Sequence, residues 1–130
     1  MRLYHFTTQS NWTKIQKEGL RPQKQTSYAL YNRHVIWLTA DGTANSAREL
    51  SANVRLVVEI GDIDPNLRKY FDYAIKPKID RDPAHAAAYQ HVSQFYRQKI
   101  ADMQSWYLYF APIPLRDYGW PRIVGSSANS

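Results

Sequence analysis

The sequence predicts an α+β fold, with one domain over residues 1–125 and a disordered tail over residues 126–130. The length of 130 residues suits a single hydrophobic core. Apolar residues make up 44% of the chain and aromatic residues 14%, which favours a folded domain over disorder. Strand-like and helix-like segments follow one another in mixed order. We therefore expect a split, mostly antiparallel sheet with a short N-terminal helix and one long helix.

The N-terminal segment has the pattern of a strand followed by a short helix. Residues 2–6 alternate enough to predict a strand. Ser10 or Asn11 can cap a helix in which Trp12 and Ile15 share one face. The sequence GLRP follows, in which the glycine can take the left-handed conformation, the leucine can pack back and the proline prevents continuation. These signals predict a helix that ends at the Gly-Leu pair.

The middle of the chain contains the clearest strands. Residues 21–32 are polar and predict a loop. His34–Thr39 (HVIWLT) is rich in β-branched and aromatic residues, which is typical of a buried strand. A turn and a short helix over residues 47–50 are expected next. Residues 54–60 (VRLVVEI) alternate regularly, so we expect a strand with one apolar face.

Two segments of the second half begin with Asp-Pro, a typical start of a helix with the aspartate as cap and the proline in the first turn. They predict helices over residues 64–71 and 82–103, the second being the long one. Residues 106–114 (WYLYFAPIP) are apolar on both faces and predict a central strand that ends at two prolines. Residues 122–124 can add a last short strand.

Composition limits the partners and the compartment. The chain has 17 Lys and Arg against 11 Asp and Glu, a net charge of +6, which favours an anionic partner such as a nucleic acid or a phosphorylated ligand. The absence of cysteine excludes disulfides and thiolate metal sites. No stretch reaches the roughly 20 apolar residues of a membrane span. We expect a cytoplasmic protein that does not contact a membrane.

The common catalytic and metal-binding motifs are missing from the sequence. The four histidines have neither HxxxH nor HxH spacing, which predicts that no metal is bound. There is no GxSxG nucleophile motif, no phosphate-binding P-loop and no GxGxxG dinucleotide fingerprint. The remaining candidate for a site is the N-terminal segment.

Four features occur in order over about residues 3–40. They are the sequence YHFT, a predicted helix that ends at GLRP, a loop that contains tyrosines, and the strand VIWLT. Together they resemble the N-terminal half of the ADP-ribosyltransferase-like superfamily. Its small prokaryotic members include toxins that modify DNA and, more distantly, NAD-dependent RNA 2′-phosphotransferases. The resemblance implies that His5 hydrogen-bonds the adenosine ribose of NAD and that Thr7 helps to hold the nicotinamide side.

The resemblance also implies an activity. NAD would be the substrate, nicotinamide would be released, and ADP-ribose would pass to a nucleic acid or a protein, as in a toxin or a phage-defence enzyme. Active members use a late glutamate, whereas the only glutamates here are Glu18, Glu49 and Glu59. We expect Glu18 to be solvated, and we take His5 with Glu59 or Glu49 as the catalytic candidates. The expected NAD-binding residues are His5, Thr7, Tyr28, Tyr31, Arg33 and Thr39, with the tyrosines near nicotinamide and Arg33 near phosphate.

Two alternatives remain open at the level of sequence. An RNA 2′-phosphotransferase of the same fold would use arginine and histidine, for which Arg33, His34 and Arg116 are candidates. A non-enzymatic module could use the basic surface and the aromatic residues to bind nucleic acid or protein. In that case His5 would be an ordinary strand-end histidine bonded to the backbone, and Trp37 would be a core residue.

Overall fold

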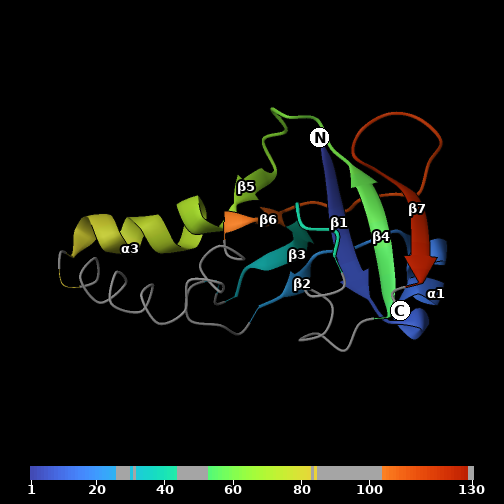
Figure 1. Cartoon of the computed structure of the whole chain (residues 1–130), viewed down its shortest axis with the longest axis horizontal. Helices are drawn as coiled ribbons and strands as arrows, with labels where there is room; N and C mark the ends of the chain where they lie inside the picture. The colour runs from blue at the N-terminus through green and yellow to red at the C-terminus, as the bar shows by residue number, and fades with distance from the viewer. Residues whose placement is uncertain (26–29, 31, 44–52, 83, 85–103, 129–130) are drawn as a thin grey trace.

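Seven strands form one sheet within the part of the chain that the computed structural model describes, residues 1–25, 30, 32–43, 53–82, 84 and 104–128 (Figure 1). The strand order is β5-β6-β3-β1-β4-β7, with β2 also paired to β3, and all these pairs are antiparallel. None of the helices in this part of the chain is long and apolar enough to cross a membrane. The strands are β1 (Arg2–Thr7), β2 (Gln23–Lys24), β3 (His34–Thr39), β4 (Val54–Glu59), β5 (Leu67–Lys69), β6 (Trp106–Tyr109) and β7 (Arg122–Ala128).

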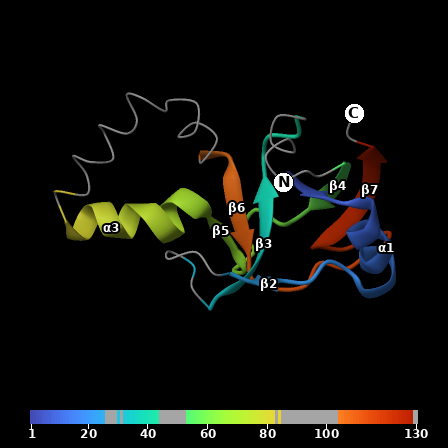
Figure 2. The same ribbon diagram turned by 90° about the horizontal axis from the view of Figure 1, so that it is seen from below.

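The helices lie at the two ends of the sheet. Helix α1 (Gln9–Glu18) lies near β4 and β7, whereas the π-helical turn η2 (Phe71–Ile75) and helix α3 (Lys76–Arg81) extend beyond β5 and β6 (Figure 2). The expected helix over residues 47–50 lies outside the described residues, as does almost all of the expected long helix over residues 82–103. The arrangement is α+β, as the sequence predicts.

The two faces of the sheet carry separate apolar clusters. On one face Leu56 and Val58 of β4 pack with Ile15 of α1. On the other, Val35 of β3 and Ala74 of η2 belong to a second cluster. Strand β4 shows the expected alternation, because its buried residues point to the α1 face and the others point away from it. The core therefore lies on both sides of a single sheet.

Helix α1 ends at the expected residue and begins earlier than expected. The cap is Thr8, whose side chain accepts a hydrogen bond from the Asn11 amide at 3.2 Å, instead of Ser10 or Asn11. At the other end the Gly19 amide donates to the Ile15 carbonyl at 2.7 Å. Gly19 has φ 78° and ψ 173°, which lies outside the left-handed helical region and is accessible mainly to glycine.

The helix expected over residues 64–71 is wrong. The Asp64 carboxylate accepts a hydrogen bond from the Asn66 amide at 2.9 Å and another from the Tyr109 hydroxyl at 2.7 Å. The first bond closes a local turn, and the second ties that turn to β6. Leu67, the first residue of β5, then pairs with Tyr109 of β6. The tertiary partner on β6 therefore outweighs the local Asp-Pro signal for a helix.

Two further expectations need correction. The loop over residues 21–32 contains the short strand β2, which pairs with the start of β3. The tail expected to be disordered from residue 126 instead continues β7 to Ala128, and Ser126 lies opposite Leu56 of β4. Pairing with a buried central strand orders this small, polar segment despite its composition.

The sheet is least connected between β1 and β3. These strands pair only at Tyr4 and Thr39, whereas β1 and β4 pair at six positions and β3 and β6 at four. The sheet is thus continuous instead of divided into two, but beyond Tyr4 the backbone ladder does not join β1 to β3. Near this point the side chain of His5 in β1 contacts the backbone carbonyl of Trp37 in β3.

We predict that Gly19→Ala destabilises the protein by roughly 1–3 kcal/mol. An added Cβ would be held at φ 78° and would lie 3.2 Å from the Ile113 carbonyl oxygen. Urea unfolding would measure the loss. The matched control is Gly125→Ala, whose Cβ would meet no atom within 4 Å and which should change stability by less than about 0.5 kcal/mol. Equal stability of the two variants would contradict the role assigned to Gly19.

Candidate functional site

A cavity of about 320 Å³ lies between α1 and strands β1 and β3. Strand β1 contributes His5 and Thr7, and α1 contributes Asn11, Lys14 and Glu18. The three helix residues are three and four positions apart, so they occupy one side of the helix. The cavity, called the His5 pocket below, therefore brings together two residues of the YHFT sequence and one face of the helix that follows it.

The alternation of β1 turns His5 toward the helix. In the ladder with β4, His5 lies opposite Leu56 and Thr7 lies opposite Val54. Directly opposed residues of an antiparallel pair point to the same face of the sheet. Leu56 belongs to the cluster that contains Ile15 of α1, so His5 and Thr7 also face α1.

The His5 ring bridges the seam between β1 and β3. Its Nδ1 lies 2.8 Å from the carbonyl oxygen of Trp37. A carbonyl only accepts hydrogen bonds, so Nδ1 carries the proton and donates it, and in the neutral ring Nε2 is left as an acceptor. Burial lowers the pKa of His5, an effect that the bond to Trp37 opposes in part. The pocket is thus lined by a neutral imidazole whose Nε2 can accept a hydrogen bond from a hydroxyl group.

Trp37 is held firmly on the opposite face of the sheet. Its indole Nε1 donates to Oε1 of Gln25 at 3.1 Å. Its ring lies 5.0 Å from the ring of Tyr70 and 5.8 Å from that of Trp106, the second in an edge-on arrangement. These contacts agree with the packing role considered for Trp37 and fix the carbonyl that orients His5.

Charged groups at the rim complete the pocket. Lys14 and Arg21 supply two cations, and Glu18 supplies the one carboxylate among the described lining residues. Glu18 is exposed, as expected, yet it faces the same cavity as His5. The spacing of Asn11, Lys14 and Glu18 in the sequence indicates that they share one side of a helix. Only the structure shows that this side faces the cavity with His5.

The structure places Glu59 away from His5. Glu59 lies opposite Arg2 at the other end of β1 and on the other face of the sheet. Its carboxylate contacts the guanidinium groups of Arg2 and Arg122, each at 3.1 Å. Hydrogen bonds from Arg2 and then from Arg122 lower the pKa of Glu59. An ion-paired carboxylate there cannot act on a ligand in the His5 pocket.

The other expected NAD-binding residues are not collected in the pocket. Thr39 is fully buried on the face opposite His5, and its Oγ1 accepts a hydrogen bond from the Asp41 amide at 3.0 Å. Arg33 is exposed just before β3 and does not line the cavity. Tyr28, Tyr31 and Glu49 lie outside the described residues. Of the expected set, the described pocket therefore contains His5 and Thr7.

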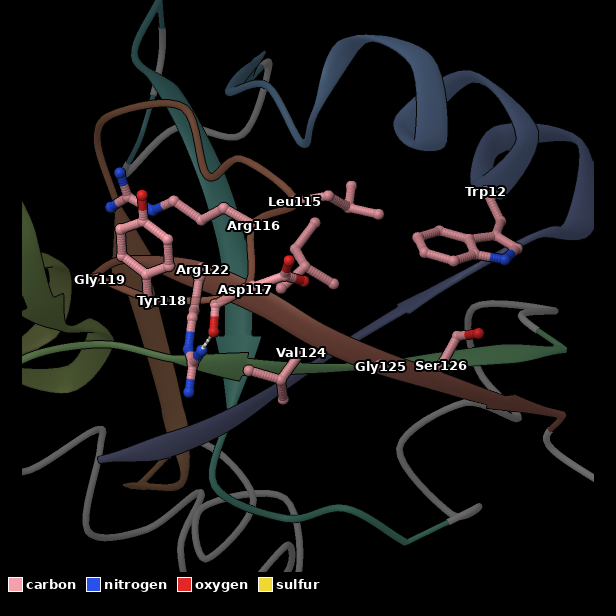
Figure 3. A pocket seen from close by; sticks show the side chains of 11 residues that line it. Trp12, Leu115, Arg116, Asp117, Tyr118, Gly119, Arg122, Val124, Gly125 and Ser126 are labelled. Carbon is pink, nitrogen blue, oxygen red and sulfur yellow. Dashed lines mark hydrogen bonds between the residues drawn. The ribbon is translucent and has the colours of Figure 1, made fainter.

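A second cavity, of about 1000 Å³, opens between Trp12 of α1 and residues 115–126 (Figure 3). Arg116, Asp117 and Arg122 are its charged residues. The Arg122 guanidinium donates to the Asp117 carbonyl and to the Glu59 carboxylate. The cavity is larger than the His5 pocket but contains no histidine. Across the described residues, no three His, Cys, Asp or Glu side chains form a group that could hold a metal ion.

We predict that His5 makes stability depend on pH. Its pKa is lowered in the folded state, so below about pH 6.5 the unfolded chain binds more protons than the folded one, and stability falls as pH decreases. The slope from this group is at most about 1.4 kcal/mol per pH unit. Urea unfolding between about pH 5 and 8 would measure it. His5→Asn, which keeps a donor for the Trp37 carbonyl, should flatten the slope. His34→Asn, at an exposed residue, should not, and equal slopes for wild type and His5→Asn would contradict the assignment.

Comparisons of the chain with protein-family models, with curated proteins and with solved structures find no match. The resemblance of residues 3–40 to ADP-ribosyltransferases therefore stands on the quoted motifs alone. What the structure adds is the geometry of the His5 pocket, and a function has to be argued from that geometry.

Proposed function

We propose that the His5 pocket binds NAD and transfers its ADP-ribose to an acceptor with release of nicotinamide. One observation carries the proposal. A neutral histidine, fixed by the Trp37 carbonyl, lines a cavity whose charged groups are two cations and a carboxylate. This combination matches a ligand that has hydroxyl, anionic and cation-forming parts. His5 and Thr7, the residues to which the resemblance assigns NAD-binding roles, both line this cavity.

Each part of NAD has a chemical counterpart in the pocket. A ribose hydroxyl can donate to Nε2 of His5, because Nδ1 is occupied by Trp37. The diphosphate can be met by Lys14 and Arg21 at the rim. The volume of about 320 Å³ is at the lower end of the range for small-molecule sites, so one end of the dinucleotide would extend beyond the cavity.

The carboxylate role passes from Glu59 to Glu18. In the transfer, the bond between ribose C1′ and the nicotinamide nitrogen breaks, and its electron pair leaves with nicotinamide. The positive charge that develops on the ribose is stabilised by a nearby carboxylate. An oxygen or nitrogen of the acceptor then bonds to C1′ and loses its proton. Among the described acidic residues, only Glu18 lines the pocket with His5.

The positive charge of the chain supports an anionic acceptor such as a nucleic acid. The phosphotransferase alternative has less support, because Arg33 and His34 are exposed beside β2 while Arg116 lines the second cavity. The alternative of a binding module without catalysis is separated by the same assay, since it requires no nicotinamide release. A toxin or phage-defence role stays a prediction from the resemblance.

We predict that His5→Ala abolishes nicotinamide release from NAD and that Glu18→Gln lowers it by about a hundredfold or more. Neither change removes an apolar core residue, although His5→Ala also removes the hydrogen bond to the Trp37 carbonyl. Release would be followed with isotopically labelled NAD, with and without single-stranded DNA or RNA. The melting temperature of each variant would show that it is folded.

Glu59→Gln is the matched control, because it changes the same chemical group on the opposite face of the sheet. It should retain release, although loss of the Arg2 and Arg122 contacts will lower stability somewhat. Wild-type release that survives in His5→Ala would refute the site. Loss of release in a folded Glu59→Gln, with Glu18→Gln active, would return the carboxylate role to β4.

A further inference from the structure

The loop over residues 115–121, between β6 and β7, exposes two large aromatic side chains. Tyr118 is 83% exposed and Trp120 is 63% exposed. They stand two residues apart, next to Arg116. Single exposed apolar residues are common on protein surfaces, but neighbouring exposed aromatics with an arginine are typical of a binding surface.

The loop is held in place from several sides. Nε of Arg116 donates to the Pro121 carbonyl at 3.1 Å, and the Arg122 guanidinium donates to the Asp117 carbonyl. The Ile123 amide donates to the Pro114 carbonyl at 3.0 Å. The two aromatic rings are thus presented on a loop whose ends are hydrogen-bonded to one another, so that little conformational entropy is lost on binding.

The loop forms one wall of the second cavity. Trp12 of α1 stands on the other side, and β7 forms the floor with Gly125 and Ser126 (Figure 3). The cavity has a volume of about 1000 Å³. Tyr118 lines the cavity, whereas Trp120 lies just outside it, where its ring would be 3.4 Å from a Cβ on Gly61. We call the cavity together with these two exposed aromatic residues of the loop the loop groove.

The loop groove lies next to the His5 pocket. Trp12 lines the groove, whereas Asn11 and Lys14 of the same helix line the pocket, so α1 separates the two. A Cβ on Gly19, at the end of α1, would lie 3.5 Å from Cα of Pro114, just before the loop. With a helix diameter of about 10 Å, a ligand in the groove is within reach of the pocket.

The charges around both cavities favour an anion. Of the two arginines in the groove, Arg122 is already ion-paired with Glu59, so Arg116 is the one that can meet a phosphate there. Lys14 and Arg21 outnumber Glu18 in the pocket. The whole chain carries +6. Exposed aromatics combined with cations along a groove are how proteins bind single-stranded nucleic acid, since bases stack on rings and phosphates meet the cations.

We propose that the loop groove binds a single-stranded nucleic acid, with bases stacked on Tyr118 and Trp120 and a phosphate at Arg116. The inference deepens the proposed function by locating its acceptor, and it rests on that function only for the transfer step. Paired bases have no free faces for these rings, so duplexes bind more weakly than single strands.

The test is the fluorescence anisotropy of labelled oligonucleotides of about 12 nucleotides, DNA and RNA, measured without NAD. The double variant Tyr118→Ala with Trp120→Ala should weaken binding at least tenfold, and Tyr118→Phe with Trp120→Phe should largely retain it. Arg116→Gln should reduce the dependence of affinity on salt. Ile63→Ala is the control, because Ile63 is 96% exposed and belongs neither to the cavity lining nor to the loop over residues 115–121.

Equal affinity of wild type and the double alanine variant, or no binding of single strands by folded wild type, would overturn the inference. So would stronger binding to a duplex than to a single strand. Failure of the proposed function is a separate result, because His5→Ala should lose nicotinamide release and keep oligonucleotide affinity. Binding without any release would leave the groove assignment standing and refute the transferase.

Discussion

The hydrogen bond from His5 Nδ1 to the Trp37 carbonyl is the contact on which the candidate site depends. Among the described strands, it crosses the one place in the sheet where neighbouring strands share a single backbone pair. It fixes the tautomer, and burial keeps the ring neutral. The same bond therefore joins two parts of the fold and prepares Nε2 to accept from a ligand hydroxyl. The gap in the backbone pairing between β1 and β3 forms a wall of the pocket because the His5 side chain spans it.

Helix α1 gives the site its second half. Ile15 fixes the helix on the sheet, Gly19 ends it against the strand-like segment at Ile113, and one helix side with Lys14 and Glu18 is left facing the seam. Trp12, on another side, faces the loop groove. The transferase activity that we propose needs a donor site and an acceptor site close together, and a single helix between two cavities would meet that need. We propose NAD for one cavity and nucleic acid for the other.

Much of the sheet was predictable, and much of the site was not. Strands β3 and β4 follow from local composition and alternation, so the sequence was sufficient for them. Asp64 misled because its partner, Tyr109, is 45 residues away. Glu59 looked free in the sequence, but Arg122, 63 residues later, pairs with it. Such long-range contacts have no local pattern, and they decided which carboxylate faces His5.

The most direct test of the central claim is ¹⁵N NMR of the His5 imidazole. The account predicts a protonated Nδ1, an unprotonated Nε2, and a pKa below the ordinary value of about 6.5. Adding NAD should shift the Nε2 resonance, because we propose that this atom accepts a hydrogen bond from a ribose hydroxyl. A ring protonated at Nε2, or a pKa at or above the ordinary value, would contradict the account. An unchanged Nε2 resonance in saturating NAD would refute the binding role of His5.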